Sequence, residues 1–405
     1  MKNNWMKNII LFLTSQTISL FGSSLVQYAI MWYITLETQS GIMMTVSIIC
    51  GFLPSFFLSP FAGVWADRYN RKILIILSDS LIAAATFILA VFFILGYDSI
   101  WMLFVVTTIR AIGSGIQTPA VNAFLPSLVP EDKLTKINGL NGSIQAFVML
   151  LSPMLSGALL SVATIETIFF IDVITALLAV VILLVFLREQ EHTRSISNEP
   201  VSYFQDLKKG IDYINKNAYL KYFFLFAGCF FILAGPVAFL TPLQVARSFG
   251  DDVWRLTAIE VTFSIGMMAG GIIMASWGGF KNRVHTMTLS SLVMGACTFL
   301  LGIISFFSLY MFIMGVFGLA MPFFNTPSTV LLQEKAEEEY LGRVFGIFGM
   351  IASFMVPLSM LLFGPLSDII KIEWMLMGTG IIMLLLSFFL LKNKTLVEAG
   401  IKETT

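Results

Sequence analysis

Long apolar runs recur along almost the whole chain, and they limit what it can fold into more than any other feature. Each run is about twenty residues or longer, the length that an α-helix needs to cross a bilayer core of roughly 30 Å. A helix on the surface of a soluble protein carries a polar face, and the run from Ile73 to Gly96 offers no continuous one. Charged residues make up only 12% of the chain, against about 25% in a typical soluble protein. We therefore predict an all-α membrane protein.

Hydropathy predicts twelve transmembrane helices. The first apolar run extends to Tyr33, which is too long for a secretion signal, so we interpret it as an uncleaved first span. The predicted spans cover residues 9–34, 42–65, 73–95, 100–125, 137–161, 167–187, 219–244, 255–277, 285–304, 307–332, 343–365 and 371–391.

The longest polar stretch, residues 188–218, separates the sixth span from the seventh. Its second part is predicted to form a surface helix, because Leu207, Ile211 and Ile214 fall on one helical face. We predict a six-helix bundle over residues 1–187, this stretch as a cytoplasmic linker, and a second six-helix bundle with a short tail over residues 219–405.

The distribution of Lys and Arg predicts the orientation. If the N-terminus is cytoplasmic, 20 of the 24 Lys and Arg residues fall in cytoplasmic segments. Arg247, Arg255 and Lys371 fall on the other side, and Arg110 lies within a span. Cytoplasmic loops of membrane proteins carry the excess of basic residues, so both termini and the linker are predicted to be cytoplasmic.

The two halves of the chain resemble each other. The segments "KLTKINGLNG" (133–142) and "YLGRVFGIFG" (340–349) share a Leu, a basic residue and two Gly at the same offsets. The Trp, Asn and Arg of residues 65–71 recur at residues 277–283, although Gly279 stands where the first half has an Asp. Two six-helix repeats predict a pseudo-symmetric transporter with its site between the halves, near the middle of the bilayer.

The segment "GVWADRYNRK" (63–72) carries four charged side chains, whereas the 25 residues that end just before the first of them, 42–66, hold none. We predict that Gly63 lets the second span approach a neighbouring helix closely. Asp67 is predicted to form part of a gate, by accepting hydrogen bonds from the N-terminus of a facing helix and pairing with Arg68 or Arg71. The alternative for Arg68, Arg71 and Lys72 is that they only fix the loop in the cytoplasm.

Arg110 is the one basic residue well inside a predicted span. Such an arginine is costly in a membrane and normally faces protein or a wet cavity. Gly113 and Gln117 share its helical face, because they follow it by three and seven residues. We interpret Arg110 as a residue that senses or relays the charge of a proton. The alternative is a structural tie to backbone carbonyls.

Carboxylates within or near the spans are the candidates for carrying protons, because a buried carboxyl group can bind and release a proton near neutral pH. They could equally attract a cationic substrate. The candidates are Asp172, Glu260, Glu37 and Asp79.

Polar side chains at helical spacing predict which helices line a substrate cavity. Gln16, Ser23 and Gln27 follow such a spacing in the first span, and Asn141 and Gln145 do so in the fifth. The alternative is that these side chains tie one helix to the next, as uncharged polar groups often do in membranes.

The charged loop resembles that of the major facilitator superfamily, whose pattern G-x-x-x-D-R-x-x-R-K is matched at every position by residues 63–72. Arg110 followed by Gly113 and Gly115 resembles a second motif of this superfamily. Pro153 and Gly157 resemble part of the drug-antiporter motif of the fifth span, with serines in place of two of its glycines. The resemblance implies the twelve-helix major facilitator fold.

Over its whole length, including "MKNNWMKNIILFL" (1–13) and "RAIGSGIQTPAVNAFLPSLVP" (110–130), the chain also resembles the Mef-type macrolide efflux proteins. That resemblance implies a cell-membrane protein that exports macrolide antibiotics in exchange for protons. The expected partners are a hydrophobic drug, protons and the lipid bilayer, with the proton gradient as energy source and no cofactor. It also implies a functional monomer and leaves room for an accessory ATP-binding protein.

Other functions remain open to different degrees. The same fold could move another solute, such as a siderophore, a lysophospholipid or a metabolite. A membrane enzyme is not indicated, because the sequence shows no nucleophile–base pair, metal cluster or phosphate loop. Net charge is zero, so nothing points to nucleic acid, and the three cysteines lie in apolar runs without metal-binding spacing.

Overall fold

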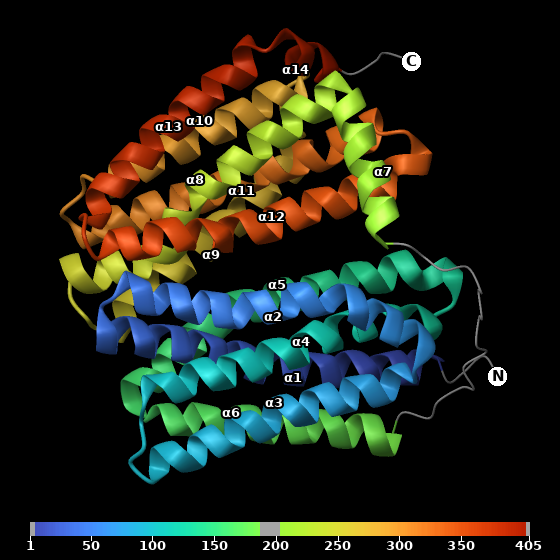
Figure 1. Ribbon diagram of the computed structural model, residues 1–405, viewed down its shortest axis with the longest axis vertical. Helices are drawn as coiled ribbons and strands as arrows, with labels where there is room; N and C mark the ends of the chain where they lie inside the picture. Colours follow the sequence, from blue (N-terminus) through green and yellow to red (C-terminus); the bar gives the residue numbers. More distant parts are fainter. Residues whose placement is uncertain (1–4, 187–202, 402–405) are drawn as a thin grey trace. The chain divides into compact units, whose positions relative to one another are not determined.

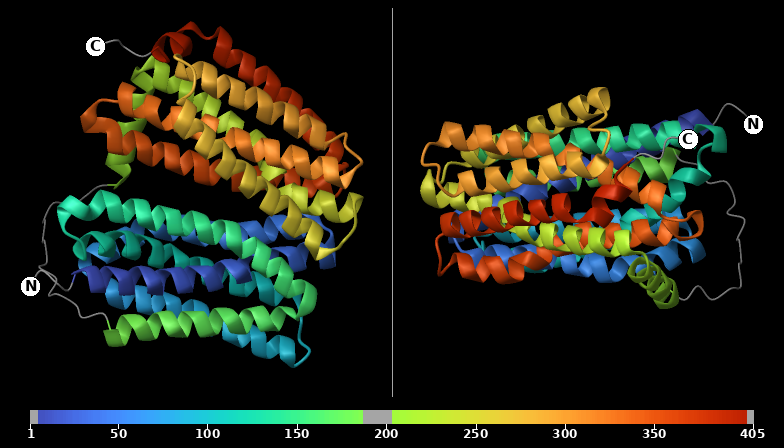
Figure 2. Two further views of the ribbon diagram at one scale, coloured as in Figure 1. Left: turned by 180° about the vertical axis from the view of Figure 1, so that it is seen from behind. Right: turned by 90° about the horizontal axis from the view of Figure 1, so that it is seen from above.

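The computed structural model describes residues 5–186 and 203–401, shown in Figure 1 with two further views in Figure 2. The side chains of residues 67, 131, 203–206 and 338 also lie outside the described part. Every regular element among the described residues is a helix, and 12 of the helices are long and apolar enough to cross a membrane. The prediction of an all-α protein with twelve spans is therefore confirmed.

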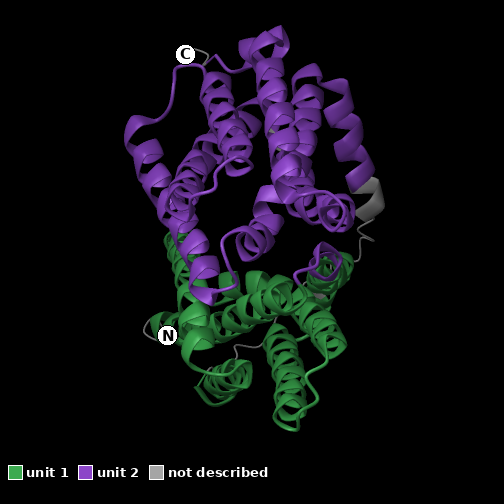
Figure 3. Ribbon diagram, turned by 90° about the vertical axis from the view of Figure 1, so that its left-hand side faces the viewer, with its two compact units in different colours: residues 1–38, 46–197 green, residues 39–45, 198–405 purple. Residues whose placement is uncertain are grey.

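The chain forms two compact units, coloured separately in Figure 3. Unit 1 comprises residues 1–38 and 46–197, and unit 2 comprises residues 39–45 and 198–405. The first part of the predicted linker, residues 188–202, lies outside the described residues. The predicted bundles differ from the units at Gln39–Thr45, which group with unit 2 because they bind α12, for example through Thr45 Oγ1, which donates to the Met360 carbonyl at 3.0 Å.

Unit 1 contains six of the long helices, the second of which begins in unit 2. A 3₁₀ turn, Glu131–Lys133, precedes α5, and α6 continues as a π-helix over Ile182–Phe186. The helices are α1 (Trp5–Thr38), α2 (Gly41–Arg68), α3 (Arg71–Ile94), α4 (Ile100–Ser127), α5 (Leu134–Val162) and α6 (Ile165–Val181).

Unit 2 contains the other six long helices and two short ones. These are α7 (Tyr203–Lys216), α8 (Ala218–Ser248), α9 (Val253–Trp277), α10 (Arg283–Leu301), α11 (Phe307–Lys335), α12 (Glu338–Ser367), α13 (Ile372–Lys392) and α14 (Lys394–Ala399). Its internal packing repeats that of unit 1, since α8 packs on α12 and α13 as α1 packs on α5 and α6, and α10 packs on α11 and α13 as α3 packs on α4 and α6. This shared pairing is the structural counterpart of the sequence repeat.

The repeated Asn residues begin equivalent helices. Asn70 Oδ1 accepts a hydrogen bond from the Ile73 amide at 3.0 Å at the start of α3, and Asn282 Oδ1 accepts one from the Val284 amide at 2.9 Å at the start of α10. Asn is a favoured N-cap because its side chain satisfies an amide that has no partner inside the helix. The repeat therefore preserves a helix start.

Helix α3 exposes apolar side chains and buries polar ones, which is the reverse of a helix on the surface of a soluble protein. Leu77 is 61% exposed, whereas the next two residues, Ser78 and Asp79, are 2% and 1% exposed. A long apolar helix in a bilayer directs its costly polar side chains toward other helices. The buried polar residues of the long helices are therefore the place to look for a functional site.

The short helix α7 runs across the direction of the long helices of unit 2 (Figure 2) and packs on α12. On the predicted apolar face, Ile214 is 7% exposed and Leu207 is partly buried, whereas Ile211 is 44% exposed. Gly210 faces α12 so closely that an added Cβ would lie 2.9 Å from Ile347 Cδ1. The absence of a side chain at Gly210 thus shifts the packed face away from Ile211.

Candidate functional site

An ion pair inside unit 1 forms the centre of a buried polar network. The Arg110 guanidinium of α4 pairs with the Asp172 carboxylate of α6, whose side chain is 0% exposed. The same guanidinium donates to the Thr86 hydroxyl of α3 and, at 3.1 Å, to the Ser23 carbonyl of α1. Arg110 therefore joins four helices and makes the tie to a backbone carbonyl that was the alternative, while its role in sensing a proton stays a prediction.

Asp172 is surrounded by donors in addition to Arg110. Ser23 Oγ donates to its Oδ1 at 3.2 Å, and Thr86 Oγ1 donates to its Oδ2 at 3.1 Å. We call Arg110, Asp172, Thr86 and Ser23 the Arg110 layer. A buried charge is tolerated when it is paired and hydrogen-bonded, and both charges of this layer meet that condition.

A second buried carboxylate, Asp79 of α3, has no such cationic partner among the described residues. Its Oδ1 accepts hydrogen bonds from Ser19 Oγ of α1 at 2.9 Å and from Gln117 Nε2 of α4 at 2.6 Å. Its Oδ2 is buried and has no hydrogen-bond partner among the described residues. We call Asp79, Ser19 and Gln117 the Asp79 layer. Both donors of this layer are neutral, so a negative charge on Asp79 would be only partly compensated.

The two layers stand one above the other along the same helices. Ser19 and Ser23 are four residues apart on α1, and both the α3 pair, Asp79 with Thr86, and the α4 pair, Arg110 with Gln117, are seven apart. At a rise of about 1.5 Å per residue, these spacings separate the layers by roughly 6–10 Å along the helix axes. At such a separation in an interior of low dielectric constant, a charge on Asp79 acts on the charges of the Arg110 layer.

Two glycines of α4 permit the packing that builds the network. A Cβ added at Gly113 would lie 2.6 Å from Ile82 Cγ1 of α3, and one added at Gly115 would lie 2.9 Å from the Ser55 Cα of α2. Both distances are shorter than a carbon–carbon contact allows, so only glycine fits without displacing the neighbour. The glycines that follow Arg110 therefore position α4 against its two neighbours.

Most of the chain matches the model of a known protein family. Residues 12–360 match the family model of the Major Facilitator Superfamily. The chain belongs to the major facilitator superfamily. It is thus a multi-pass membrane transporter and not an enzyme, in agreement with the prediction.

Two relatives in this superfamily carry the same name. The chain is 32% identical over 384 residues to macrolide efflux protein A of Streptococcus pyogenes, covering 94% of this chain and 95% of the relative. It is 31% identical over 323 residues to macrolide efflux protein A of Enterococcus faecalis, covering 79% of this chain and 99% of the relative. The predicted resemblance to macrolide efflux proteins is confirmed.

Solved structures of the superfamily share the fold. The crystal structure of a bacterial homologue of the human lysosomal transporter Spinster, in its inward-facing and unoccupied conformation, matches with a TM-score of 0.71 at 12% identity, over 100% of both chains. At this identity the likeness concerns the fold alone.

The superfamily loop of residues 63–72 is only partly explained by the structure. The side chain of Asp67 lies outside the described residues, so its gating role stays a prediction. A Cβ added at Gly63 would meet no described atom within 4 Å, so the close helix approach at Gly63 also stays a prediction. Arg71 donates to the Ala66 carbonyl at 2.9 Å and to the Ala123 carbonyl at 2.8 Å, whereas Arg68 is exposed and Lys72 is partly buried. Arg71 thus ties the turn between α2 and α3 to α4.

The equivalent turn of unit 2, between α9 and α10, has Gly279 at the position that corresponds to Asp67. Gly278 and Gly279 have φ angles of 74° and 81°, in the left-handed region that favours glycine. Arg283, the counterpart of Arg71, forms an ion pair with Glu334 of α11. The turn of unit 2 is therefore built on glycine backbone geometry, and a side chain at position 279 would be strained, with its Cβ 2.8 Å from Thr286 Oγ1.

The remaining candidate carboxylates do not join the network. Glu37 is exposed near the C-terminal end of α1, and Glu260 is partly buried on α9 in unit 2. No group of three or more His, Cys, Asp and Glu side chains among the described residues could hold a metal ion.

Of the predicted cavity-lining residues, Ser23 belongs to the Arg110 layer. Gln27 and Gln145 are exposed, whereas Gln16 and Asn141 are partly buried. Their place in a substrate cavity stays a prediction.

The drug-antiporter residues Pro153 and Gly157 are buried on α5, which packs on α1. The serine between them, Ser156, donates from its Oγ to the Leu25 carbonyl of α1 at 3.1 Å. A serine that replaces a glycine of the motif therefore bonds the two helices to each other.

Two members of the network were missed in the sequence, namely Thr86 and Ser19. Thr86 follows Asp79 by two helical turns, and Ser19 lies between Gln16 and Ser23 on α1. Helical spacing from an intramembrane carboxylate was the available signal for both residues.

Proposed function

We propose that the protein exports macrolide antibiotics across the cell membrane in exchange for protons, with both termini in the cytoplasm. The observation that carries the proposal is the similarity to macrolide efflux protein A over 94% of this chain. The count of 20 cytoplasmic Lys and Arg residues out of 24 supports the orientation. The buried network of unit 1 supports coupling to protons, because it holds two ionisable carboxylates within the spans.

Asp79 is the residue proposed to carry the proton. Its donors, Ser19 and Gln117, are neutral, and its Oδ2 has no partner among the described residues. An uncompensated carboxylate in a bilayer interior costs several kcal/mol more than a neutral carboxylic acid. Asp79 therefore has more to gain from binding a proton than Asp172, whose charge is already balanced by Arg110.

The Arg110–Asp172 pair is proposed to sense that proton. When Asp79 is neutral, Arg110 compensates one carboxylate, and when Asp79 is charged, it faces two. A buried cation shared between two anions shifts toward the one that is less well compensated. Since Arg110 contacts α1, α3 and α6, such a shift changes the contacts among four helices. This is how a proton bound at Asp79 would bias the conformation of unit 1.

Drug accumulation in a macrolide-sensitive host tests the proposal. Cells that express the protein are expected to accumulate less labelled macrolide than control cells, and a protonophore is expected to abolish the difference. The matched variants are Asp79→Asn, which is expected to lose export, and Glu37→Gln, which changes an exposed carboxylate and is expected to retain it. Equal accumulation with and without the protein would contradict the macrolide assignment and would favour another solute.

A further inference from the structure

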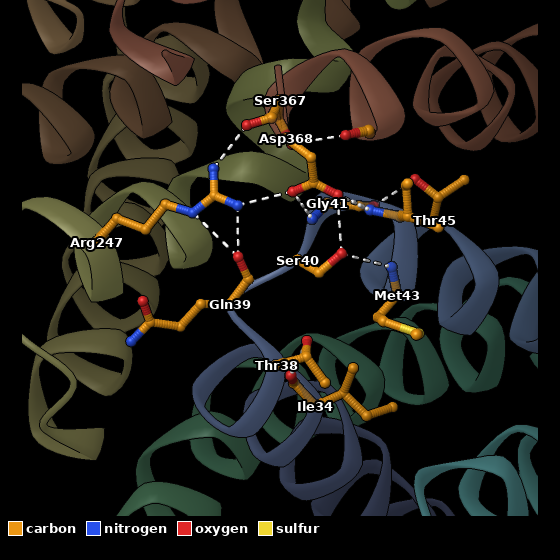
Figure 4. A network of polar contacts seen from close by, with 12 residues as sticks. Ile34, Thr38, Gln39, Ser40, Gly41, Met43, Thr45, Arg247, Ser367 and Asp368 are labelled. Atoms are coloured by element: carbon orange, nitrogen blue, oxygen red, sulfur yellow. Dashed lines mark hydrogen bonds and ion pairs between the residues drawn. The ribbon is translucent and has the colours of Figure 1, made fainter. Parts of the chain in front are cut away.

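The connection between α1 and α2 is held by an arginine from another part of the chain. Arg247, in the last turn of α8, donates from Nη1 to the Ser367 carbonyl at 2.7 Å and from Nε to the Gln39 carbonyl at 3.1 Å. Its Nη2 donates to the Asp368 carboxylate at 2.8 Å and also to the Gln39 carbonyl. Figure 4 shows all three nitrogens of the guanidinium engaged. The connection is therefore bound from several directions by one side chain.

Asp368, directly after α12, binds the N-terminus of α2. Its carboxylate accepts hydrogen bonds from the Gly41 amide at 2.7 Å, the Ile42 amide at 3.0 Å and the Ser40 hydroxyl at 2.8 Å (Figure 4). The first amides of a helix lack partners inside it, and its N-terminus favours negative charge. Partial burial by itself raises the pKa of the Asp368 carboxyl, but the bonds from Gly41, Ile42, Ser40 and Arg247 lower it below its ordinary value.

Close packing of two glycines brings α2 and α12 together at this point. A Cβ added at Gly41 would lie 1.9 Å from Ser367 Oγ and 2.2 Å from the Gly364 carbonyl oxygen. One added at Gly364 would lie 1.6 Å from Thr45 Oγ1. Neither glycine can be replaced without separating the helices or displacing these groups.

Several features distinguish this contact from permanent helix packing. Its main bonds are polar, and the side chains of Arg247 and Asp368 are 28% and 21% exposed, so water can replace their partners when the contact opens. Gln39 has a φ of 45°, the one positive φ among the described non-glycine residues, so the closed contact keeps its backbone in an unfavourable conformation. Residues 39–45 are covalently continuous with α1 and with the rest of α2, which belong to unit 1.

We propose that Asp368 and Arg247 form a reversible clasp on residues 39–42, closed in one state of the transport cycle and open in another. By the distribution of basic residues, the clasp lies at the outer end of the helices. Its closed form holds residues 39–42, the connection between α1 and α2, against the ends of α8 and α12. The inference requires only that the chain is a transporter that alternates between states, and not that its substrate is a macrolide.

Labelling of a buried cysteine tests whether these residues control opening. Thr45, 5% exposed beneath the clasp, is replaced by Cys after Cys50, Cys229 and Cys297 have been replaced by Ser. Loss of one hydrogen bond to a charged group changes an opening equilibrium by about tenfold. Asp368→Asn is therefore expected to accelerate reaction with a water-soluble maleimide by about that factor.

A second opening variant and two matched controls complete the labelling test. Gly41→Ala opens the clasp by steric clash without changing any charge, and it is expected to accelerate labelling as well. The first control, Asp252→Asn, breaks an exposed ion pair with Arg255 within one segment of unit 2. The second, Gly378→Ala, adds a methyl group where no atom lies within 4 Å. Unchanged labelling in both opening variants, or equal acceleration in the controls, would overturn the proposal.

A disulfide tests whether the clasp must open. Ser40 Oγ and the Asp368 carboxylate are in direct contact, so Ser40→Cys combined with Asp368→Cys is expected to form a disulfide under oxidant. Transport is expected to fall by at least about tenfold in the oxidised protein and to recover on reduction, while each single variant is unaffected by oxidant. Full transport with the disulfide formed, or a pair that stays unlinked, would count against the clasp. If the wild-type protein proves not to transport macrolides, the labelling experiment still tests the clasp, because it needs no transported substrate.

Discussion

Replacing Asp172 by Asn is expected to destabilise the protein by about 3 kcal/mol. Removing one partner of a buried ion pair costs about 3–5 kcal/mol, because the other charge is left uncompensated. Asp172 is 0% exposed and the side chain of Arg110 is 10% exposed, so water cannot compensate the guanidinium. Arg110 keeps its bonds to the Thr86 hydroxyl and the Ser23 carbonyl, each of which contributes about 1 kcal/mol. The lower end of the range therefore applies.

A double-mutant cycle tests this reasoning. Arg110→Gln should also destabilise the protein, because it leaves the Asp172 carboxylate uncompensated, but combining it with Asp172→Asn removes both charges at once. The double variant is expected to be more stable than either single variant, with a coupling energy of at least about 2 kcal/mol. Unfolding of the purified protein in detergent, followed by tryptophan fluorescence, measures all four proteins. Additive effects of the two substitutions would refute the assignment of a buried, mutually compensating pair.

Three further predictions concern packing, pH and the short helix. Gly113→Ala is expected to lower the free energy of unfolding by about 1–3 kcal/mol, because the added methyl group would lie 2.6 Å from a side-chain carbon. Gly63→Ala adds a methyl group with no atom within 4 Å and is expected to leave the stability unchanged. Thermal unfolding of both variants measures the difference. The lowered pKa of Asp368 means that its contribution is present above the ordinary pKa of Asp and is lost only as pH falls through the lowered value. The ratio of labelling rates of the Thr45→Cys protein with and without Asp368→Asn, in which the pH dependence of the thiol itself cancels, should therefore not change between about pH 5 and pH 8. Tyr213→Phe removes the hydroxyl that accepts from the Glu337 amide at 3.1 Å but keeps the ring, so amide exchange should accelerate by about tenfold at the start of α12 and not elsewhere.

The sequence was sufficient to predict the spans, because each is specified locally. A run of about twenty apolar residues can satisfy its backbone in a bilayer only as a helix, whatever its neighbours are. The helix starts at Asn70 and Asn282 are equally local, since an N-cap depends on the next three residues alone.

The composition of the network could not be predicted to the same extent. Helical periodicity places Arg110 and Gln117 on one face of α4, but it does not say which helices that face meets. In the sequence, Asp172 and Glu260 therefore ranked slightly above Glu37, and Asp79 came last. Only the packing of α3 and α6 against α4 and α1 separates the paired carboxylate from the one with neutral donors.

The clasp was missed because its members lie far apart along the chain. Arg247 and Asp368 are separated by 121 residues, and Asp368 binds an amide 327 residues away. The one available signal was that Arg247 lies on the non-cytoplasmic side in the predicted topology, where few basic residues are found.

Gradient-driven uptake by purified protein in liposomes tests the central claim most directly. With an acidic lumen, protons that leave through the wild-type protein should drive labelled macrolide inward, beyond the uptake of protein-free liposomes with the same gradient. The Asp79→Asn variant should lose this gradient-driven uptake but still exchange labelled for unlabelled drug across the membrane, because it can bind the drug and cannot bind the proton. Gradient-driven uptake of equal rate in wild type and Asp79→Asn would contradict the role of Asp79. Wild-type uptake that ignores the pH gradient would contradict proton antiport itself.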